Sequence, residues 1–408
     1  MMMHRFIRLS AILAGISLGL GTIVPSANAA PAQPTGAQWR LVTAPPGSGP
    51  SQYTGVSASS DRDVWAVGSQ DIDPKSWSGR PLAAHFDGRR WTEVKVPGKV
   101  GLYSVTAVNP REVWALRTGS EPGATAPEVL RYDGNRWATV RLAPVGAGKV
   151  FPRTLHVFAP NNIWVVGYVM DDVKRTSRGF SQHFDGRSWK AVEIPTLGKA
   201  GLAISLTVTG GQTWIAGCSG NFGDGDAYFA RLDGKTWRPV PGPAGSECAQ
   251  TAAVLPDGRL LTATGNAART NAAANPSTAR TIAGHTGERQ RPATGNGWKW
   301  TNATYAWNGK AWQEYKAPLA NGVLNKLNSD GRGGVWGLGV DQEHPNVARF
   351  DGKRWTKIAL GASLAQLDAH LFNGVQVGGS TSQWAVGQTN DFLEFTDATK
   401  GVIARYGH

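Results

Sequence analysis

The sequence predicts an all-β fold, a seven-bladed β-propeller built from four-stranded antiparallel blades. Two observations lead to this prediction. A short apolar strand that contains Trp returns about every 50 residues, and a turn of the form Asp-Gly-x-x-Trp follows it in most copies. A period of this length, built only from short strands, is typical of propellers, in which each repeat folds into one blade.

The spacing of the repeat gives the number of blades. The strand Trp residues stand at positions 65, 114, 164, 214, 336 and 384, so that successive spacings are 49, 50, 50, 122 and 48. The gap of 122 residues holds one degenerate unit, whose apolar strand is Leu260–Gly265. The sequence therefore contains seven units. The turns begin at Asp87, Asp133, Asp185, Asp233, Asn308 and Asp351.

The second unit illustrates one blade. We expect strands at Leu102–Val108 and Val113–Leu116, a third strand that ends at Tyr132, and a fourth at Trp137–Val140. Asp-Gly favours a two-residue hairpin, because Gly accepts a positive φ and Asp caps nearby amides. The Trp of the turn then lies on the outer strand, where its ring can fill the space between neighbouring blades.

The two ends of the repeat region complement each other. Residues Ile403–His408 match the third strand and turn of a unit, but no Trp strand follows them. Residues Gln38–Val42 match a fourth strand that has no predecessors. We therefore expect the N-terminal strand to close the last blade, which leaves no free sheet edge.

Residues 1–29 have the order of a secretory signal peptide. Arg5 and Arg8 precede an apolar run at Ala11–Val24, and Ala27–Ala29 reads as a cleavage site. Cleavage there removes two Arg and no acid, so the net charge falls from +13 to +11. We expect a secreted, extracellular protein with no membrane span and a propeller domain at 30–408.

The chain has two cysteines, Cys218 and Cys248. In an oxidising compartment an isolated pair favours a disulfide over a redox or metal site. Cys218 ends the apolar strand of the fourth unit and Cys248 opens the fifth, so both can lie on the same face. Two buried thiols that never meet are the alternative.

The two faces of the disc differ in sequence. Short turns on one face carry a ring of cations, which suits either a polyanion or simple solvation: Arg89, Arg90, Arg136, Arg187, Lys235, Lys310, Lys353 and Arg354. The variable second-to-third loops lie on the other face, where binding sites are usually built. Trp beside carboxylates suits sugar recognition, although ordinary surface loops have the same composition. The candidate ligand-binding residues are Asp71, Asp73, Trp77, Asp171, Asp172, Phe222, Asp224, Asp226, Asp341, Glu343, His344 and Asp391.

The fifth unit contains an insertion at about 265–300. It is rich in Ala, Thr, Asn and Arg and lacks apolar periodicity, so we expect it to be mobile. Its net charge of +4 complements the acidic loops of other units. It is either a lid over the variable face or a plain disordered excursion.

Catalytic motifs are missing from the sequence. It contains no HExxH, GxSxG, P-loop or Cys/His metal spacing, and we expect neither a metal nor a cofactor. His85 and His183 occupy one repeat position, which indicates a structural role for both. The same position is Arg131, Arg231, Arg349 and Arg405 in other units. Carboxylates near the central channel leave a glycan hydrolase or lyase open.

The chain resembles secreted bacterial repeat propellers. Its period near 50 is similar to kelch repeats and to the central domain of galactose oxidase. Val-Trp-Ala-Val-Gly followed by Asp-Gly-x-x-Trp is similar to tectonin-type lectin repeats, and the turn looks like the Asp-box of sialidases. The resemblance spans roughly 37–408 and rests on fold-defining positions, so it implies the fold and carries over no catalytic residue.

We interpret the chain as a secreted, non-catalytic binding propeller that holds a glycan or a protein on its variable face. The alternative is an extracellular glycan hydrolase or lyase, and a third is a structural partner in a secreted assembly. We expect a monomer with no nucleic-acid partner.

Overall fold

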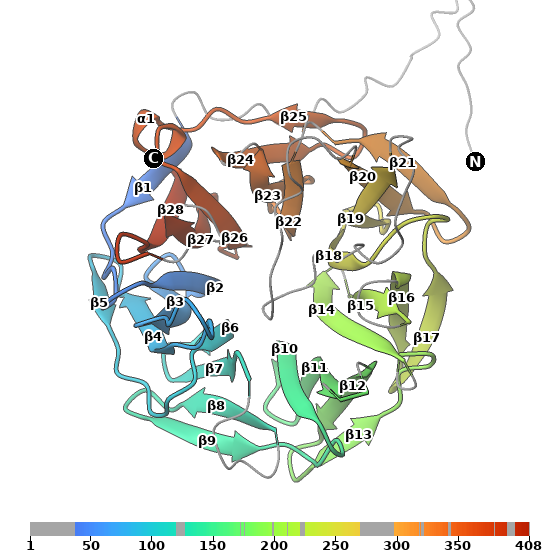
Figure 1. The fold of residues 1–408 in the computed structure, drawn as a ribbon, viewed down its shortest axis with the longest axis horizontal. Helices are drawn as coiled ribbons and strands as arrows, with labels where there is room; N and C mark the ends of the chain where they lie inside the picture. Colours follow the sequence, from blue (N-terminus) through green and yellow to red (C-terminus); the bar gives the residue numbers. More distant parts are fainter. Residues whose placement is uncertain are drawn as a thin grey trace, which may run out of the picture. The chain divides into compact units, whose positions relative to one another are not determined.

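The computed structural model describes residues 37–119, 127–171, 173–174, 176–197, 200–209, 211–220, 225–269, 298–317, 319, 322–341, 344–378, 380–389 and 396–407. Within these ranges the strands form seven four-stranded antiparallel sheets, arranged around a common axis (Figure 1). This confirms the predicted seven-bladed propeller. The predicted signal peptide lies outside the described residues.

The first blade contains β2 (Gln52–Ser60), β3 (Asp63–Gln70), β4 (Arg80–Phe86) and β5 (Trp91–Glu93). The second contains β6 (Leu102–Asn109), β7 (Glu112–Arg117), β8 (Glu128–Tyr132) and β9 (Trp137–Arg141). The third contains β10 (Lys149–Ala159), β11 (Asn162–Asp171), β12 (Thr176–Phe184) and β13 (Trp189–Val192). The fourth contains β14 (Gly201–Thr209), β15 (Gln212–Ser219), β16 (Asp226–Asp233) and β17 (Thr236–Pro241).

The fifth blade contains β18 (Ala249–Val254), β19 (Leu260–Arg269), β20 (Trp298–Trp307) and β21 (Trp312–Lys316). The sixth contains β22 (Gly322–Ser329), β23 (Val335–Asp341), β24 (His344–Phe350) and β25 (Trp355–Lys357). The short helix α1 (Ala362–Ala365) leads to the seventh, which contains β26 (Ala369–Gln376), β27 (Gln383–Thr389), β28 (Gly401–Gly407) and β1 (Gln38–Val42). The four strands expected in the second unit match β6 to β9 within about one residue at the predicted ends.

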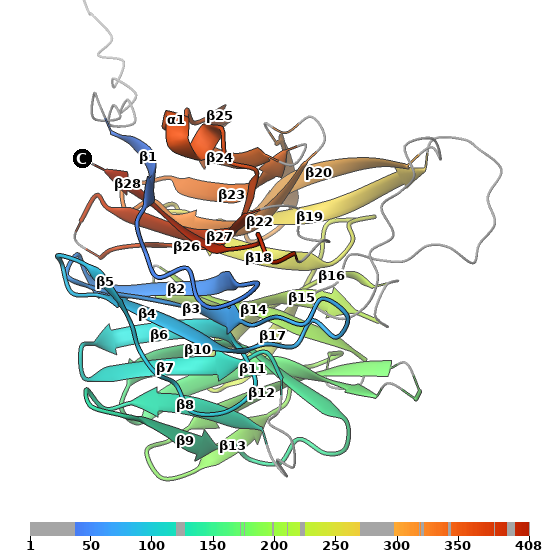
Figure 2. The ribbon, with the colours of Figure 1, turned by 60° about the vertical axis from the view of Figure 1, so that its left-hand side comes forward.

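The N-terminal strand closes the ring, as predicted. β1 pairs antiparallel with β28, from Gln38 opposite Gly407 to Val42 opposite Ile403 (Figure 2). Trp39 is buried and lies 5.9 Å from the ring of Trp336, in the sixth blade. The first strand of the propeller therefore joins the last blade and also contacts the blade before it.

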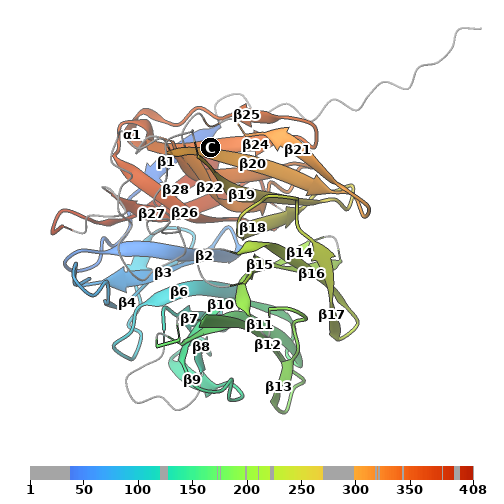
Figure 3. The same ribbon diagram turned by 45° about the vertical axis from the view of Figure 1, so that its right-hand side comes forward.

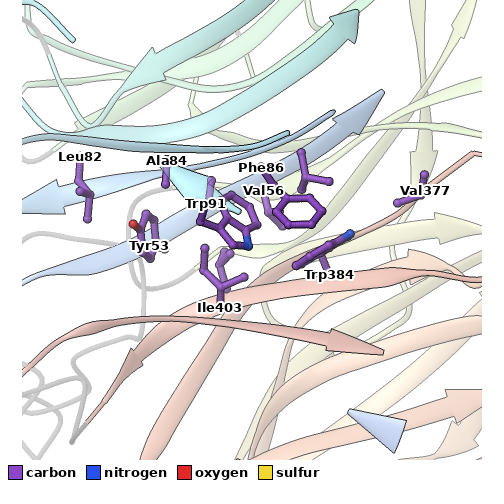
Figure 4. Packing of buried hydrophobic residues seen from close by; sticks show 12 residues of the cluster. Tyr53, Val56, Leu82, Ala84, Phe86, Trp91, Val377, Trp384 and Ile403 are labelled. Carbon is purple, nitrogen blue, oxygen red and sulfur yellow. The ribbon is translucent and has the colours of Figure 1, made fainter. Parts of the chain in front are cut away.

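Aromatic side chains fill the boundaries between blades. In the boundary between the first and seventh blades, Trp91 on the outer strand β5 meets Trp384 on β27 edge-on at 5.4 Å (Figure 4). Trp237 meets Trp164 in the same way, at 5.4 Å, between the fourth and third blades. The Trp of the turn motif thus fills the space between blades, as its position on the outer strand predicts.

Hydrogen bonds join the inner strands of neighbouring blades at each of the seven boundaries around the axis. At each boundary a Thr or Asn side chain of one inner strand bonds the backbone of the next. The pairs are Thr54–Leu102, Thr106–Leu155, Thr154–Ile204, Thr207–Ala252, Thr251–Leu327, Asn325–Leu371 and Asn373–Thr54. These bonds satisfy backbone groups that face the axis and have no further strand to pair with.

Each inner strand carries one β-bulge within its first five residues. A bulge leaves one residue unpaired and re-aims its side chain. The bulged residues are Thr54, Tyr103, Arg153, Ile204, Gln250, Asn325 and Phe372. Because the inner strands surround the axis, the bulges form a ring near one end of it.

In most of the Asp-Gly turns the strand register leaves four residues unpaired, although a backbone hydrogen bond, such as Asp87 N to Arg90 O at 3.3 Å, closes the inner two as predicted. Phe86 pairs with Trp91, which leaves four residues between the paired strands. The carboxylate of Asp87 accepts hydrogen bonds from the backbone amides of Arg89 and Arg90, at 2.8 and 2.9 Å. These bonds lower the pKa of Asp87. Only the turn after Asp233 has two residues, because Asp233 itself pairs with Thr236.

The repeated His/Arg position is structural, as predicted. Asp63 accepts hydrogen bonds from Trp65 Nε1 at 3.1 Å and His85 Nε2 at 2.8 Å, and the imidazole stacks on the indole. In the next blade Arg131 pairs with Glu112 and lies over a Trp ring. In these two blades the acidic residue at the start of the second strand, Asp63 or Glu112, thus holds the His or Arg side chain against the Trp ring.

The strands β19 and β20 extend into the predicted insertion. Gly265 pairs with Asn302 and Arg269 with Trp298, so both ends of the segment 265–300 are strand (Figure 2). Backbone pairing needs no apolar periodicity, which is why the composition did not reveal it. Residues 270–297 lie outside the described residues, and so does the predicted mobility there.

Removal of the Trp39 side chain tests ring closure. Because Trp39 is buried between two blades, Trp39→Ala should lower the free energy of unfolding by about 3–5 kcal/mol. The measurement is urea unfolding followed by Trp fluorescence, together with light scattering for oligomers that form through the freed edge of β28. A half-buried outer-strand residue, in Trp189→Ala, is the control and should cost less. A Trp39→Ala variant as stable as the parent would contradict the closure described above.

A second prediction concerns His156 on the inner strand β10. Burial lowers the pKa of this imidazole to about 4. Between pH 6.5 and 4 the unfolded chain therefore binds a proton that the folded chain does not, and stability falls as the pH is lowered. The loss should reach about 3 kcal/mol relative to His156→Gln. Parallel stability curves of parent and variant over this range would refute the prediction.

Candidate functional site

The connections of the propeller define two faces. Neighbouring strands of a blade are antiparallel, so the second-to-third loops and the links between successive blades leave from the same end of the strands. We call this end the loop face and the opposite end, with the Asp-Gly turns, the turn face. The bulges near the start of each inner strand lie toward the loop face.

The loop between β3 and β4 contains three of the predicted residues, Asp71, Asp73 and Trp77. Asp73 holds the loop together: its carboxylate accepts hydrogen bonds from Lys75 N at 2.8 Å and Ser76 Oγ at 3.0 Å. The hydrogen bond from Lys75 is the main reason for the lowered pKa of Asp73. Asp73 therefore has a structural task within its own loop.

Asp71 faces a neighbouring segment. Its carboxylate forms an ion pair with Arg80 and accepts a hydrogen bond from Ser48 Oγ at 2.9 Å. The backbone at Asp71 and Trp77 has φ values of 51° and 57°, which residues with a side chain seldom adopt. Such strained positions collect at binding sites, because the surrounding structure must hold them in place.

A hollow of about 530 Å³ opens beside Asp71 at the seam between the first and last blades. We call it the seam hollow, and its lining residues are Pro50, Asp71, Ile72, Pro74, Thr396 and Asp397. Among the predicted residues only Asp71 lines it. Thr396 and Asp397 were missed, because they meet Asp71 only when the ring closes. Pro50 was missed as well, although it lies beside this loop within the first blade, where Ile72 N donates to Pro50 O at 3.0 Å.

Hydrogen bonds fix both sides of the seam hollow. Ser51 N donates to Thr399 O at 3.0 Å, and Gly401 N donates to Ser51 Oγ at 3.0 Å. Lys400 Nζ donates to Gly49 O at 2.6 Å. The two walls come from opposite ends of the chain, and these bonds give them a defined spacing.

Buried polar atoms without a hydrogen-bond partner lie at the same seam. They are Gln52 Oε1 and both amide atoms of Gln388, at the loop-face ends of β2 and β27. A buried polar atom without a partner destabilises the fold by about 1–3 kcal/mol. The seam therefore contains buried polar atoms whose hydrogen-bonding capacity the protein itself does not satisfy.

The other predicted residues lie on separate blades. Asp171 caps its own turn through Val173 N and Lys174 N, at 3.1 and 3.0 Å. Asp226 begins β16, and Asp341 is the register partner of His344 in the sixth blade. The structure does not bring them to the seam hollow. Outside the described residues are Asp172, Phe222, Asp224, Glu343 and Asp391.

Cys218 and Cys248 form a disulfide, as expected, with Cα atoms 4.5 Å apart. It links the end of β15 to the segment that enters β18, two strands that lie side by side (Figure 3). Both residues are buried with Phe151, Tyr168 and other apolar side chains. The bond therefore ties the fourth and fifth blades together under the loop face.

Loss of the disulfide should destabilise the chain measurably. The bond closes a loop of 30 residues, and the chain-entropy model gives about 3–4 kcal/mol for a loop of this length. Urea unfolding of the double variant Cys218→Ala, Cys248→Ala against the parent measures the difference. Reduction of the parent under native conditions should give a similar loss. Equal stability of all three would refute the prediction.

The turn face carries cations that are partly neutralised. Lys190 pairs with Asp185 at 2.6 Å, and Arg238 pairs with Asp233 at 2.5 Å. Cations of the predicted ring stay exposed even where they pair: Arg136 is 85% exposed and lies 3.9 Å from the carboxylate of Asp133. In the described part of the chain, no group of three or more His, Cys, Asp or Glu is arranged to hold a metal ion. No helix in that part has the length and apolarity needed to cross a membrane.

Comparison with known proteins identifies the fold. No family model matches the chain, so the kelch and tectonin resemblances find no family support. No curated protein matches it either. A structure of YCF48 bound to D1 peptide has a TM-score of 0.56 at 15% identity, with 91% of this chain and 97% of that chain covered.

Two lyases are similar to the chain as well. Virginiamycin B lyase from Staphylococcus aureus with quinupristin has a TM-score of 0.53 at 12% identity, covering 90% of this chain and 98% of that one. The polysaccharide lyase Uly1 has a TM-score of 0.52 at 9% identity, covering 85% and 88%. At such identities the likeness concerns the fold alone. The chain thus shares its propeller fold with YCF48 and with lyases.

Proposed function

We propose that the chain is a secreted, non-catalytic binding propeller that holds a segment of another protein in the seam hollow. The seam hollow is the main support for this proposal. It lies between the loop of Asp71, which has a strained backbone and was predicted as a binding loop, and a wall that contains Asp397. Secretion is supported by the order of charged, apolar and small residues within 1–29.

The lining of the seam hollow favours a protein over a glycan. Pro50, Pro74 and Ile72 offer apolar surface, whereas none of the six lining residues is aromatic and can stack on a sugar ring. The carboxylates of Asp71 and Asp397 can accept hydrogen bonds from backbone amides or from a basic side chain. YCF48, which shares the fold, is bound to a peptide in its structure.

Selection of ligands from a displayed random peptide library, with a glycan array run in parallel, tests the proposal. Peptides enriched by the parent should bind Asp397→Ala about tenfold more weakly, because one charged contact is lost. The matched control is Asp368→Ala, which removes an exposed acid elsewhere on the loop face and should bind like the parent. Enrichment of glycans alone, or equal binding by Asp397→Ala, would refute a protein ligand in the seam hollow.

A further inference from the structure

The wall around the axis has a one-sided charge. The seven inner strands β2, β6, β10, β14, β18, β22 and β26, all within the described residues, contain no Asp and no Glu. They contain Lys149, Arg153 and Lys326, and in addition His156 and His370. A wall of one sign with low-dielectric surroundings concentrates its field along the axis and attracts the opposite charge.

Arg153 is the bulged residue of β10 and is buried at 4% exposure. Its guanidinium lies over the rings of Tyr103 at 4.4 Å and Tyr168 at 4.9 Å, and donates a hydrogen bond to the Tyr168 hydroxyl. No carboxylate of the described residues pairs with it. A guanidinium stays charged in proteins, so π faces and phenol oxygens offset its charge only in part.

Lys326 stands on the other side of the axis, directly after the bulge of β22. Its side chain is half-buried, and burial lowers the pKa of its ammonium group. It too has no carboxylate partner among the residues that the structure describes. Buried charges are normally paired, so both cations favour an anion near the loop-face end of the axis.

Around these two cations the bulges present aromatic and amide side chains. Tyr103 and Phe372 are half-buried, and Gln250 is exposed. Phe372 lies in the seventh blade, between Lys326 in the sixth blade and the seam between the seventh and the first. An extended ligand held at the seam can therefore continue inward along the seventh blade toward Lys326.

We propose that the loop-face end of the axis is an anion-binding site, formed by Arg153 and Lys326, for a carboxylate of an acidic peptide segment. The anion site rests on the axial wall alone, whereas the choice of a peptide as occupant rests on the proposed function. The ligand then presents a basic or neutral part to Asp71 and Asp397 at the seam and an acidic part to the axis.

Thermal unfolding at constant ionic strength with triglutamate as the probe tests the site. A saturating concentration should raise the melting temperature of the parent by about 1–3 °C. Lys326→Gln should abolish this shift. The matched control, Lys353→Gln, removes the same charge from the turn face and should keep it. Arg153→Lys is a further variant that keeps the charge but loses the planar fork, and its shift should be smaller.

Three results would overturn the proposal. They are no shift for the parent with either triglutamate or trigalacturonate, an undiminished shift for Lys326→Gln, or a shift lost in Lys353→Gln. A shift with trigalacturonate and none with triglutamate would overturn the peptide as occupant and assign an acidic saccharide instead. The variant Asp397→Ala distinguishes this site from the seam hollow. It should keep the triglutamate shift whatever its affinity for the library-selected peptides. If it binds those peptides like the parent, the proposed function fails and the anion site still stands.

Discussion

Closure between the first and the seventh blades is the contact on which the rest of the ring depends. Six of the seven blade boundaries join segments that follow each other along the chain, whereas the seventh joins residues more than 300 positions apart, such as Asn373 and Thr54. The pairing of β1 with β28 adds a second long-range contact within the last blade. If this boundary opens, the aromatic cluster around Trp384 becomes exposed, and if β1 detaches as well, so does the edge of β28.

The same boundary also creates the candidate site. The wall of the seam hollow that contains Asp71 comes from the first blade, and the wall that contains Asp397 comes from the last. Any ligand that contacts both walls binds only the closed ring, so binding and closure stabilise each other. The polar atoms of Gln52 and Gln388 that lack partners lie at this boundary too. The proposed function and the stability of the ring thus depend on the same contacts.

Periodic features of this fold follow from the sequence, while local geometry does not. The repeat of Trp and Asp-Gly predicts the blades, the complementary ends predict closure, and Cys218 with Cys248 predicts the disulfide. The seam hollow could not be predicted, because Pro50 and Asp397 are far apart in the sequence and are residue types common in surface loops. The length of the Asp87 turn depends on how one carboxylate divides its hydrogen bonds, and the strand at Gly265 depends on backbone pairing. Neither leaves a pattern in side-chain polarity.

The order of synthesis gives the closure of the last blade a further meaning. Among the described strands β1 is made first, whereas its partner β28 is made after all the others. Until these segments of the chain have been made, Trp39 has neither Trp336 nor Tyr406 to cover it. The growing chain can stack its blades one after another, yet the ring stays an open arc until β28 has been made. A polypeptide truncated before β28 would therefore keep most of its blades but expose unpaired strand edges, and we expect it to aggregate or to be degraded.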